Sequence, residues 1–156
     1  MNFSGKRLLL TGAGKGIGRA LAEMLVARGA SVFAMTRSGG DVEALKRDLG
    51  VDAVQVDMAD PEATRAAARA GLPCDYLINN AGTTELQPFL ETTVEAFDKL
   101  IAVNTRAPMI VAQEYAKARI ASGKGGAIVN VSSVSSFIGF RDHAAYCASK
   151  AGLDGL

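Results

Sequence analysis

The chain has 156 residues, about the size of one ordinary domain. Its 17 basic and 16 acidic residues give a formal net charge of +1, so there is no electrostatic reason to expect nucleic acid or an anionic membrane as a partner. No apolar run is long enough to span a bilayer, and Cys74 and Cys147 lack metal-binding spacing. We therefore expect a cytoplasmic protein with no metal site, no nucleic-acid partner and no membrane span.

Apolar runs alternate with segments of helical period along the chain. Strands are predicted at 7–11, 31–36, 53–56, 75–78 and 127–131. Helices are predicted at 17–28, at 41–49, from Pro61, over about 94–122 (continuous or broken before Asn104), and from about Ala144. This order predicts an α/β fold with a doubly wound, Rossmann-like parallel sheet. We expect one dinucleotide-binding domain over residues 1–156.

A glycine-rich turn lies between the first predicted strand and the first predicted helix. Its glycines permit a tight turn and close approach of the backbone to a diphosphate, and the helix N-terminus favours an anion. A glycine-rich loop without a ligand is the alternative, but the strand–turn–helix setting favours a dinucleotide. The predicted cofactor contacts in the turn are Gly12, Gly14, Lys15, Gly16, Ile17 and Gly18.

Further motifs follow this turn in a fixed order. The turn reads T-G-x-x-x-G-x-G, Asn79-Asn80-Ala81-Gly82 ends the fourth strand, Ser133 follows the fifth, and Tyr146-x-x-x-Lys150 lies on the last helix. With these motifs the chain resembles the short-chain dehydrogenase/reductase family over essentially its whole length. "TGAGKGIGR", "QPFLE" and "AIVNVSS…YCASK" resemble most the L-xylulose (dicarbonyl) reductase branch of that family.

The choice of cofactor can be predicted from charge. NAD-binding members of such folds carry an acidic residue about twenty residues after the glycines, whereas here Arg37 occupies that region and no carboxylate follows until Asp41. An arginine can bind a 2′-phosphate with two hydrogen bonds, and Lys15 adds a second cation, so we predict NADP(H). The alternative is that both are solvated surface side chains. The resemblance also implies that Asp57 contacts the adenine and that Asn80, Ala81 and Gly82 line the ribose.

The last helix carries a candidate acid catalyst. A carbonyl reduced by hydride needs a proton donor, and a tyrosine, which ionises near about pH 10, needs a nearby cation to serve at neutral pH. Lys150 shares a helical face with Tyr146, so we predict Tyr146 as acid/base and Lys150 as the group that stabilises its phenolate. The resemblance implies that Lys150 also holds the nicotinamide ribose, that Ser133 positions the substrate oxygen, and that Asn104 completes a proton relay.

Each of these residues has a plainer interpretation when taken singly. A Tyr-x-x-x-Lys pair is usually packing plus a solvated amine, Asn104 fits a helix break, and Ser133 fits a turn hydroxyl. Their joint occurrence favours catalysis. His143, the only histidine, is either a substrate contact, as the resemblance implies, or a surface residue at a helix start.

The resemblance also implies further strands after the Tyr146–Lys150 helix, so the sequence is interpreted as lacking a C-terminal part. We predict an NADP(H)-dependent oxidoreductase acting on a small carbonyl or secondary alcohol, of the sugar or dicarbonyl reductase type. A 3-oxoacyl thioester reductase and an inactive NADP(H)-binding fragment are the alternatives. A complete chain would be expected to form a homodimer or homotetramer.

Overall fold

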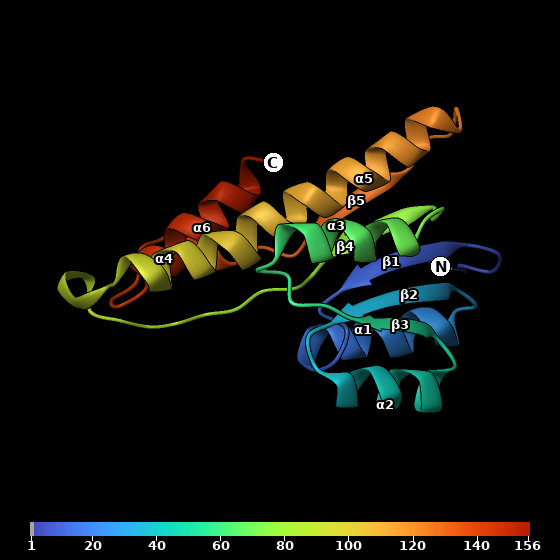
Figure 1. Cartoon of the computed structure of the whole chain (residues 1–156), viewed down its shortest axis with the longest axis horizontal. Helices are drawn as coiled ribbons and strands as arrows, with labels where there is room; N and C mark the ends of the chain where they lie inside the picture. The colour runs from blue at the N-terminus through green and yellow to red at the C-terminus, as the bar shows by residue number, and fades with distance from the viewer. Residues whose placement is uncertain (1) are drawn as a thin grey trace.

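The computed structural model describes residues 2–156 and contains one five-stranded sheet (Figure 1). The strands are β1 (Arg7–Thr11), β2 (Ser31–Thr36), β3 (Asp52–Gln55), β4 (Tyr76–Asn79) and β5 (Ala127–Asn130). Their order is β3-β2-β1-β4-β5, and all neighbours are parallel. This order reverses direction at β1, between β2 and β4, which makes a crevice at the carboxyl ends of these strands. The predicted doubly wound α/β fold is confirmed.

The helices alternate with the strands as the sequence predicts. They are α1 (Gly16–Ala27), α2 (Gly39–Leu49), α3 (Pro61–Ala70), α4 (Val94–Ile101), α5 (Ala107–Ala121) and α6 (Ala144–Asp154), with 3₁₀ turns η1 (Phe89–Glu91) and η3 (Val134–Ser136). Between α4 and α5 lies η2 (Ala102–Arg106), one turn of π-helix. The long helix therefore keeps its direction through η2. Where the sequence allowed a break before Asn104, the structure has a π-turn, which is wider than a turn of α-helix.

Differences from the predicted elements are small and have local causes. The prediction for α2 began at Asp41, whereas the helix begins at Gly39 because Ser38 is its N-cap and accepts from the Asp41 backbone N–H at 3.4 Å. Strands β3 and β4 each lie one residue from their predicted positions, and β5 ends at Asn130 rather than at residue 131. Asp60 caps α3, and Pro61 occupies its first turn, as predicted.

Helices cover the sheet on both faces. On one face Leu8 and Leu10 of β1 pack with Ala22 and Leu25 of α1 and with Leu45 of α2. On the other face the intervening residue Leu9 packs with side chains of α3 and α5. Successive residues of β1 therefore point to opposite cores, which is why its sequence is a continuous apolar run rather than an alternating one.

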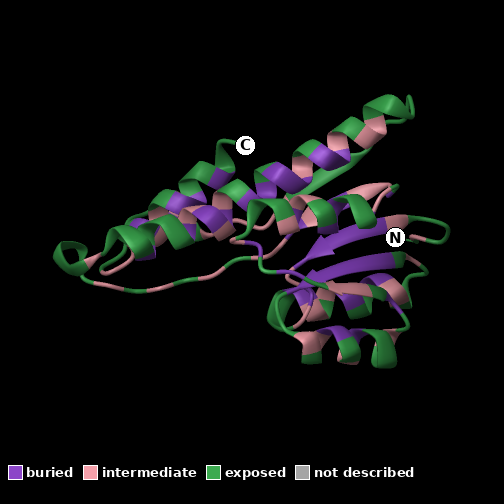
Figure 2. Cartoon of the chain, in the orientation of Figure 1, coloured by how far each residue is buried: buried purple, intermediate pink, exposed green. Residues whose placement is uncertain are grey.

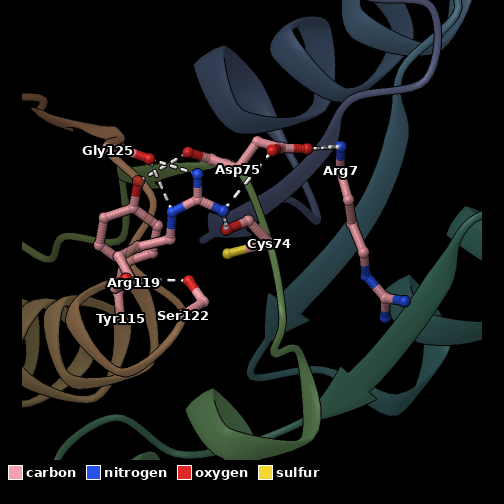
Figure 3. Close-up of polar contacts among 7 residues, drawn as sticks. All are labelled: Arg7, Cys74, Asp75, Tyr115, Arg119, Ser122 and Gly125. Atoms are coloured by element: carbon pink, nitrogen blue, oxygen red, sulfur yellow. Dashed lines mark hydrogen bonds and ion pairs between the residues drawn. The ribbon is translucent and has the colours of Figure 1, made fainter.

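A polar cluster at the opposite end of the sheet from the glycine turn fixes the starts of β4 and β5 (Figure 3). The Tyr115 hydroxyl of α5 donates to the Asp75 carbonyl at 2.7 Å, and the Arg119 guanidinium donates to the carbonyls of Cys74 and Gly125. The Asp75 carboxylate accepts from the Arg7 backbone N–H at 3.0 Å. Helix α5 is thereby attached to the two segments that lead into β4 and β5.

Strand β5 is the least covered part of the sheet. Three of its four residues are exposed, while β1 and β2 are almost entirely buried (Figure 2). The side chains of Ile128 and Val129 are 41% and 54% exposed. Within residues 2–156 no helix is both long and apolar enough to cross a membrane.

Candidate active site

The glycine turn runs from the end of β1 into α1, and glycine is required at its positions for different structural reasons. Gly12 has a left-handed φ of +67°, and a Cβ there would lie 2.7 Å from the Ala81 Cα. A Cβ on Gly18 would lie 2.0 Å from the Gly12 carbonyl oxygen, because α1 begins directly against the turn. Gly16 has a φ of +56° and open space beside it, so its backbone conformation is what favours glycine.

Hydrogen bonds between Thr11, the last residue of β1, and the segment that follows the neighbouring strand β4 hold this turn. The Asn80 side chain donates to the carbonyls of Thr11 and Gly12 at 3.0 and 3.1 Å. The Thr11 hydroxyl accepts from the backbone N–H groups of Asn80 and Ala81, both at 3.0 Å. The turn is therefore braced by hydrogen bonds within the protein, so its shape does not depend on a bound ligand.

A cavity of about 550 Å³ opens over this turn at the carboxyl ends of the first four strands. All of the predicted cofactor residues except Gly16 line it. The sequence did not predict the other lining residues, which are Met35, Thr36, Ser38, Asp41, Val56, Met58, Ala59, Thr83, Lys99 and Val103. The volume, the glycine cradle and the place at the switch point of the sheet fit a dinucleotide.

Charges of both signs line the cavity near the end of β2. Arg37 and Lys15 make no ion pair with any of residues 2–156, so their cationic groups are available to an anion. Asp41 lines the same cavity and receives a hydrogen bond from the Thr36 hydroxyl at 3.4 Å. A Cβ on Gly14 would lie 2.2 Å from an Asp41 carboxylate oxygen, which explains why that position of the turn is glycine.

Asn104 and Lys150 come together beside Gly82. A Cβ on Gly82 would lie 3.4 Å from the Asn104 Oδ1 and 3.5 Å from the Lys150 Nζ. Lys150 is 4% exposed, and its ammonium donates to the Val131 carbonyl at 2.9 Å. Burial lowers the pKa of Lys150 below its ordinary value, and the charge of Asp154 partly opposes this shift. Because Gly82 also lines the cavity, these two side chains lie next to the cavity wall.

The other predicted catalytic residues lie around the start of α6. Tyr146 and His143 are half-buried, and their rings form an edge-to-face pair with centroids 6.2 Å apart. His143 Nδ1 lies 2.6 Å from the Arg141 carbonyl, so Nδ1 is the donor in this contact, and in the neutral ring Nε2 is an acceptor. The Ser133 hydroxyl caps η3 by accepting from the Ser135 backbone N–H at 3.1 Å. It still has its own proton to donate.

The family of the chain follows from comparison with known proteins. The model of the family described as short chain dehydrogenase matches residues 6–156. The chain belongs to the short chain dehydrogenase family. D-erythrulose reductase of Gallus gallus and L-xylulose reductase of Bos taurus are each 48% identical to it over 157 aligned residues, which include 100% of this chain. The chain spans 64% of the length of these curated relatives.

The fold is shared with solved structures of the family. One is a metagenomic short-chain oxidoreductase in complex with NADP, which is 35% identical to this chain, with a TM-score of 0.89. The match covers 98% of this chain and 72% of the other. The Rossmann-like sheet described above is therefore the sheet of a short chain dehydrogenase.

Sequence reasoning about this dehydrogenase missed two features of the site. Asp41 was noted only as the first carboxylate after β2, although its position three residues after the N-cap Ser38 is a signal that it faces back toward the preceding strand. Ser149 was not singled out at all. It is fully buried beside Asn104, and the signal for it was a hydroxyl next to Lys150 on an otherwise apolar helical face. Residues 2–156 hold no group of three or more His, Cys, Asp or Glu side chains that could bind a metal ion.

Proposed function

We propose that this short chain dehydrogenase is an NADP(H)-dependent oxidoreductase that interconverts a small carbonyl compound and its secondary alcohol, of the sugar or dicarbonyl reductase type. The observation that carries this proposal is the place of Gly82, which lines the nucleotide cavity and lies beside both Asn104 and Lys150. A nucleotide in the cavity would extend directly to the residues that the sequence pattern marks as catalytic.

The chain offers contacts to several parts of the nucleotide. Backbone N–H groups of the glycine turn and the N-terminus of α1 would hold the diphosphate. Asp57 would contact the adenine, Asn80 and Ala81 would line the ribose, and Lys150 would hold the second ribose. When bound, the nicotinamide supplies or accepts the hydride.

The catalytic step then requires the chain to move one proton. The Tyr146 hydroxyl would donate its proton to the substrate oxygen during reduction and take it back during oxidation. The Lys150 ammonium would stabilise the phenolate between these events. The Ser133 hydroxyl would donate a hydrogen bond to the same substrate oxygen, and Asn104 would connect Lys150 to solvent.

The preference for a 2′-phosphate rests on Arg37 and Lys15, both in the cavity wall. An unpaired guanidinium can hold a phosphate with two hydrogen bonds, and no carboxylate occupies the end of β2 where NAD-specific members of such folds carry one. Asp41 opposes this preference, so the expected selectivity for NADPH over NADH is moderate, about ten- to a hundredfold.

The proposed substrate class follows the relatives, which are named for L-xylulose and D-erythrulose. Polyols and α-dicarbonyls present an extra hydroxyl or carbonyl beside the reacting carbon. His143 Nε2, which is free to accept, lies on the same face as Tyr146 and suits such a hydroxyl.

The test combines binding with turnover. NADPH and NADH titrations, followed by nucleotide fluorescence, should give tighter binding of NADPH, and Arg37→Ala should remove that difference. NADPH oxidation should then be measured with L-xylulose, D-erythrulose, diacetyl and acetoacetyl thioesters. Equal affinities for NADPH and NADH, both in the wild type and in Arg37→Ala, would contradict the proposed preference for NADP(H). Oxidation with the thioesters alone would identify a 3-oxoacyl thioester reductase instead.

We also propose a domain organisation, a location and an oligomeric state for the protein. We propose that residues 1–156 act as one dinucleotide-binding domain, located in the cytoplasm, where the free thiols Cys74 and Cys147 stay reduced.

We also propose a homo-oligomer, because large apolar side chains such as Phe89 and Phe137 are 75% and 83% exposed. Light scattering tests the assembly. If NADPH binds and no carbonyl compound is reduced, the protein is a binding fragment rather than an enzyme.

A further inference from the structure

We propose that Ser149 is a positioning residue that fixes Asn104 relative to the helix carrying Tyr146 and Lys150. The proposal rests on the proposed function, because it concerns the geometry of the same site. Ser149 lies on α6 directly before Lys150, and its side chain is fully buried. It touches neither the cavity nor solvent, so it acts only through its neighbours.

The distances around the Ser149 hydroxyl identify both the group to which it donates and the group from which it accepts. It donates its one proton to the Tyr146 carbonyl at 2.8 Å, the residue one turn earlier in α6. With that proton committed, the oxygen can only accept from Asn104, whose Nδ2 lies 2.9 Å away. One hydroxyl therefore connects the π-turn η2 to the backbone of the residue predicted to donate the proton.

This contact completes the orientation of the Asn104 carboxamide. The Asn104 Oδ1 accepts from the Thr83 backbone N–H at 2.8 Å, and Nδ2 donates to the Thr83 carbonyl at 2.9 Å. The second Nδ2 proton goes to Ser149. A flipped amide would place its NH₂ group against the N–H of Thr83 and its oxygen against the carbonyl, so the three bonds permit one orientation.

The result of that orientation is a polar side chain aimed at the site. The Asn104 Oδ1 lies on the Gly82 side, where a Cβ on Gly82 would be 3.4 Å from it and 3.5 Å from Lys150 Nζ. Asn104 is itself fully buried. Without Ser149, one buried N–H of Asn104 would have no partner, and the amide would gain freedom to rotate or shift.

The chain provides a matched control at the same helix contact. The Thr105 hydroxyl, one residue after Asn104, donates to the Ser149 carbonyl at 2.7 Å. Thr105→Val removes a hydrogen bond between η2 and α6 without removing any bond of Asn104. Ser149→Ala removes the Asn104 bond, and Ser149→Thr retains a hydroxyl there.

The experiment compares these three variants with the wild type by steady-state kinetics and thermal unfolding. Ser149→Ala should lower kcat for the preferred carbonyl substrate about tenfold, with KM and the NADPH dissociation constant within about twofold of the wild type. Ser149→Thr should restore most of kcat. Thr105→Val should lower the melting temperature by a similar amount to Ser149→Ala and leave kcat unchanged. An equal fall of kcat in Ser149→Ala and Thr105→Val would overturn the proposal, because packing alone would then explain it.

A second measurement does not depend on turnover. The side-chain amide of Asn104, assigned in ¹⁵N–¹H spectra through an Asn104→Asp variant, should show slow exchange of both protons in the wild type and in Thr105→Val. In Ser149→Ala one of the two should exchange at least about tenfold faster. Unchanged exchange overturns the positioning role. If the wild type binds NADPH without reducing any substrate, the proposed function fails, and this exchange measurement alone decides the role of Ser149.

Discussion

Two regions of the molecule, the nucleotide side around the glycine turn and the proposed catalytic side around β5 and α6, differ in how fully they are buried. On the nucleotide side, β1, β2 and the glycine turn are buried and braced by Asn80 and Thr11. On the proposed catalytic side, which comprises β5, η3 and α6, the strand is exposed. Polar contacts on this side include the cluster of Tyr115 and Arg119 and the bonds of Ser149 and Lys150. Apart from changes at Lys150, which would hold the second ribose, changes to the catalytic side should therefore affect nucleotide binding little.

The largest expected effect separates chemistry from nucleotide binding. Tyr146→Phe should lower kcat about 10³-fold, because the proton donor is lost, and leave NADPH affinity within about twofold. The matched control is Tyr115→Phe, which removes a buried hydroxyl that donates to the Asp75 carbonyl, far from the proposed chemistry. Turnover that persists in Tyr146→Phe would remove this residue from the mechanism.

The next effect compares two residues that pair across the sheet. Leu77 of β4 lies in register with Ile128 of β5, and their side chains are 0% and 41% exposed. Leu77→Ala should cost about 3 kcal/mol in the free energy of unfolding, and Ile128→Ala less than about 1 kcal/mol. Urea titrations followed by circular dichroism measure both. Similar losses would mean that another surface covers β5 in solution.

A smaller effect concerns how the helices on one face of the sheet are held. Glu114 of α5 accepts from Arg69 and Arg65 of α3, each at 2.7 Å, and from Lys117 at 3.1 Å. These hydrogen bonds, that of Arg69 foremost, lower the pKa of Glu114 from 4.5 to about 2. A lowered carboxyl pKa stabilises the fold fully above about pH 4.5, and that contribution is lost as the pH falls toward about 2.

Glu114→Gln should therefore destabilise the protein by about 2 kcal/mol at pH 7 and flatten the dependence of stability on pH in that acid range. Chemical unfolding at a series of pH values gives the comparison. Glu43→Gln, an exposed position of α2 that forms no ion pair with residues 2–156, serves as the control. The same flattening in both variants would show that net charge, and not the Glu114 cluster, causes the effect.

The smallest effect tests the opposing charge on the nucleotide side. Asp41→Asn should tighten binding of 2′,5′-ADP about fivefold, roughly 1 kcal/mol, and leave 5′-AMP unchanged, because a carboxylate in the cavity repels a 2′-phosphate. Isothermal titration with the two nucleotides measures it. Glu43→Gln removes a charge from the same helix outside the cavity and should change neither affinity. If 2′,5′-ADP binds less tightly to Asp41→Asn, Asp41 supports the turn rather than repelling the phosphate.

The sequence predicted the nucleotide side more closely than the catalytic side, for physical reasons. β1 and β2 were found to the residue because both faces of these strands are buried, which leaves a continuous apolar run with sharp ends. The glycine turn was found because its motif is local. The role of Ser149 and the π-turn η2 were not predicted, because both involve contacts between α6 and the long helix, and such contacts join residues more than forty positions apart.

The π-turn η2 has a consequence for how the length of this chain can vary. A π-turn holds one more residue than a turn of α-helix, so it behaves as a single-residue insertion that the helix absorbs without ending. Deleting one residue there would restore regular α-helix and keep α5 in its present register relative to α4. Asn104 lies within the π-turn, so its direction relative to Thr83 and Ser149 would change while α5 stayed in place. A natural or engineered deletion at this point would leave a folded protein in which Asn104 no longer makes its present hydrogen bonds.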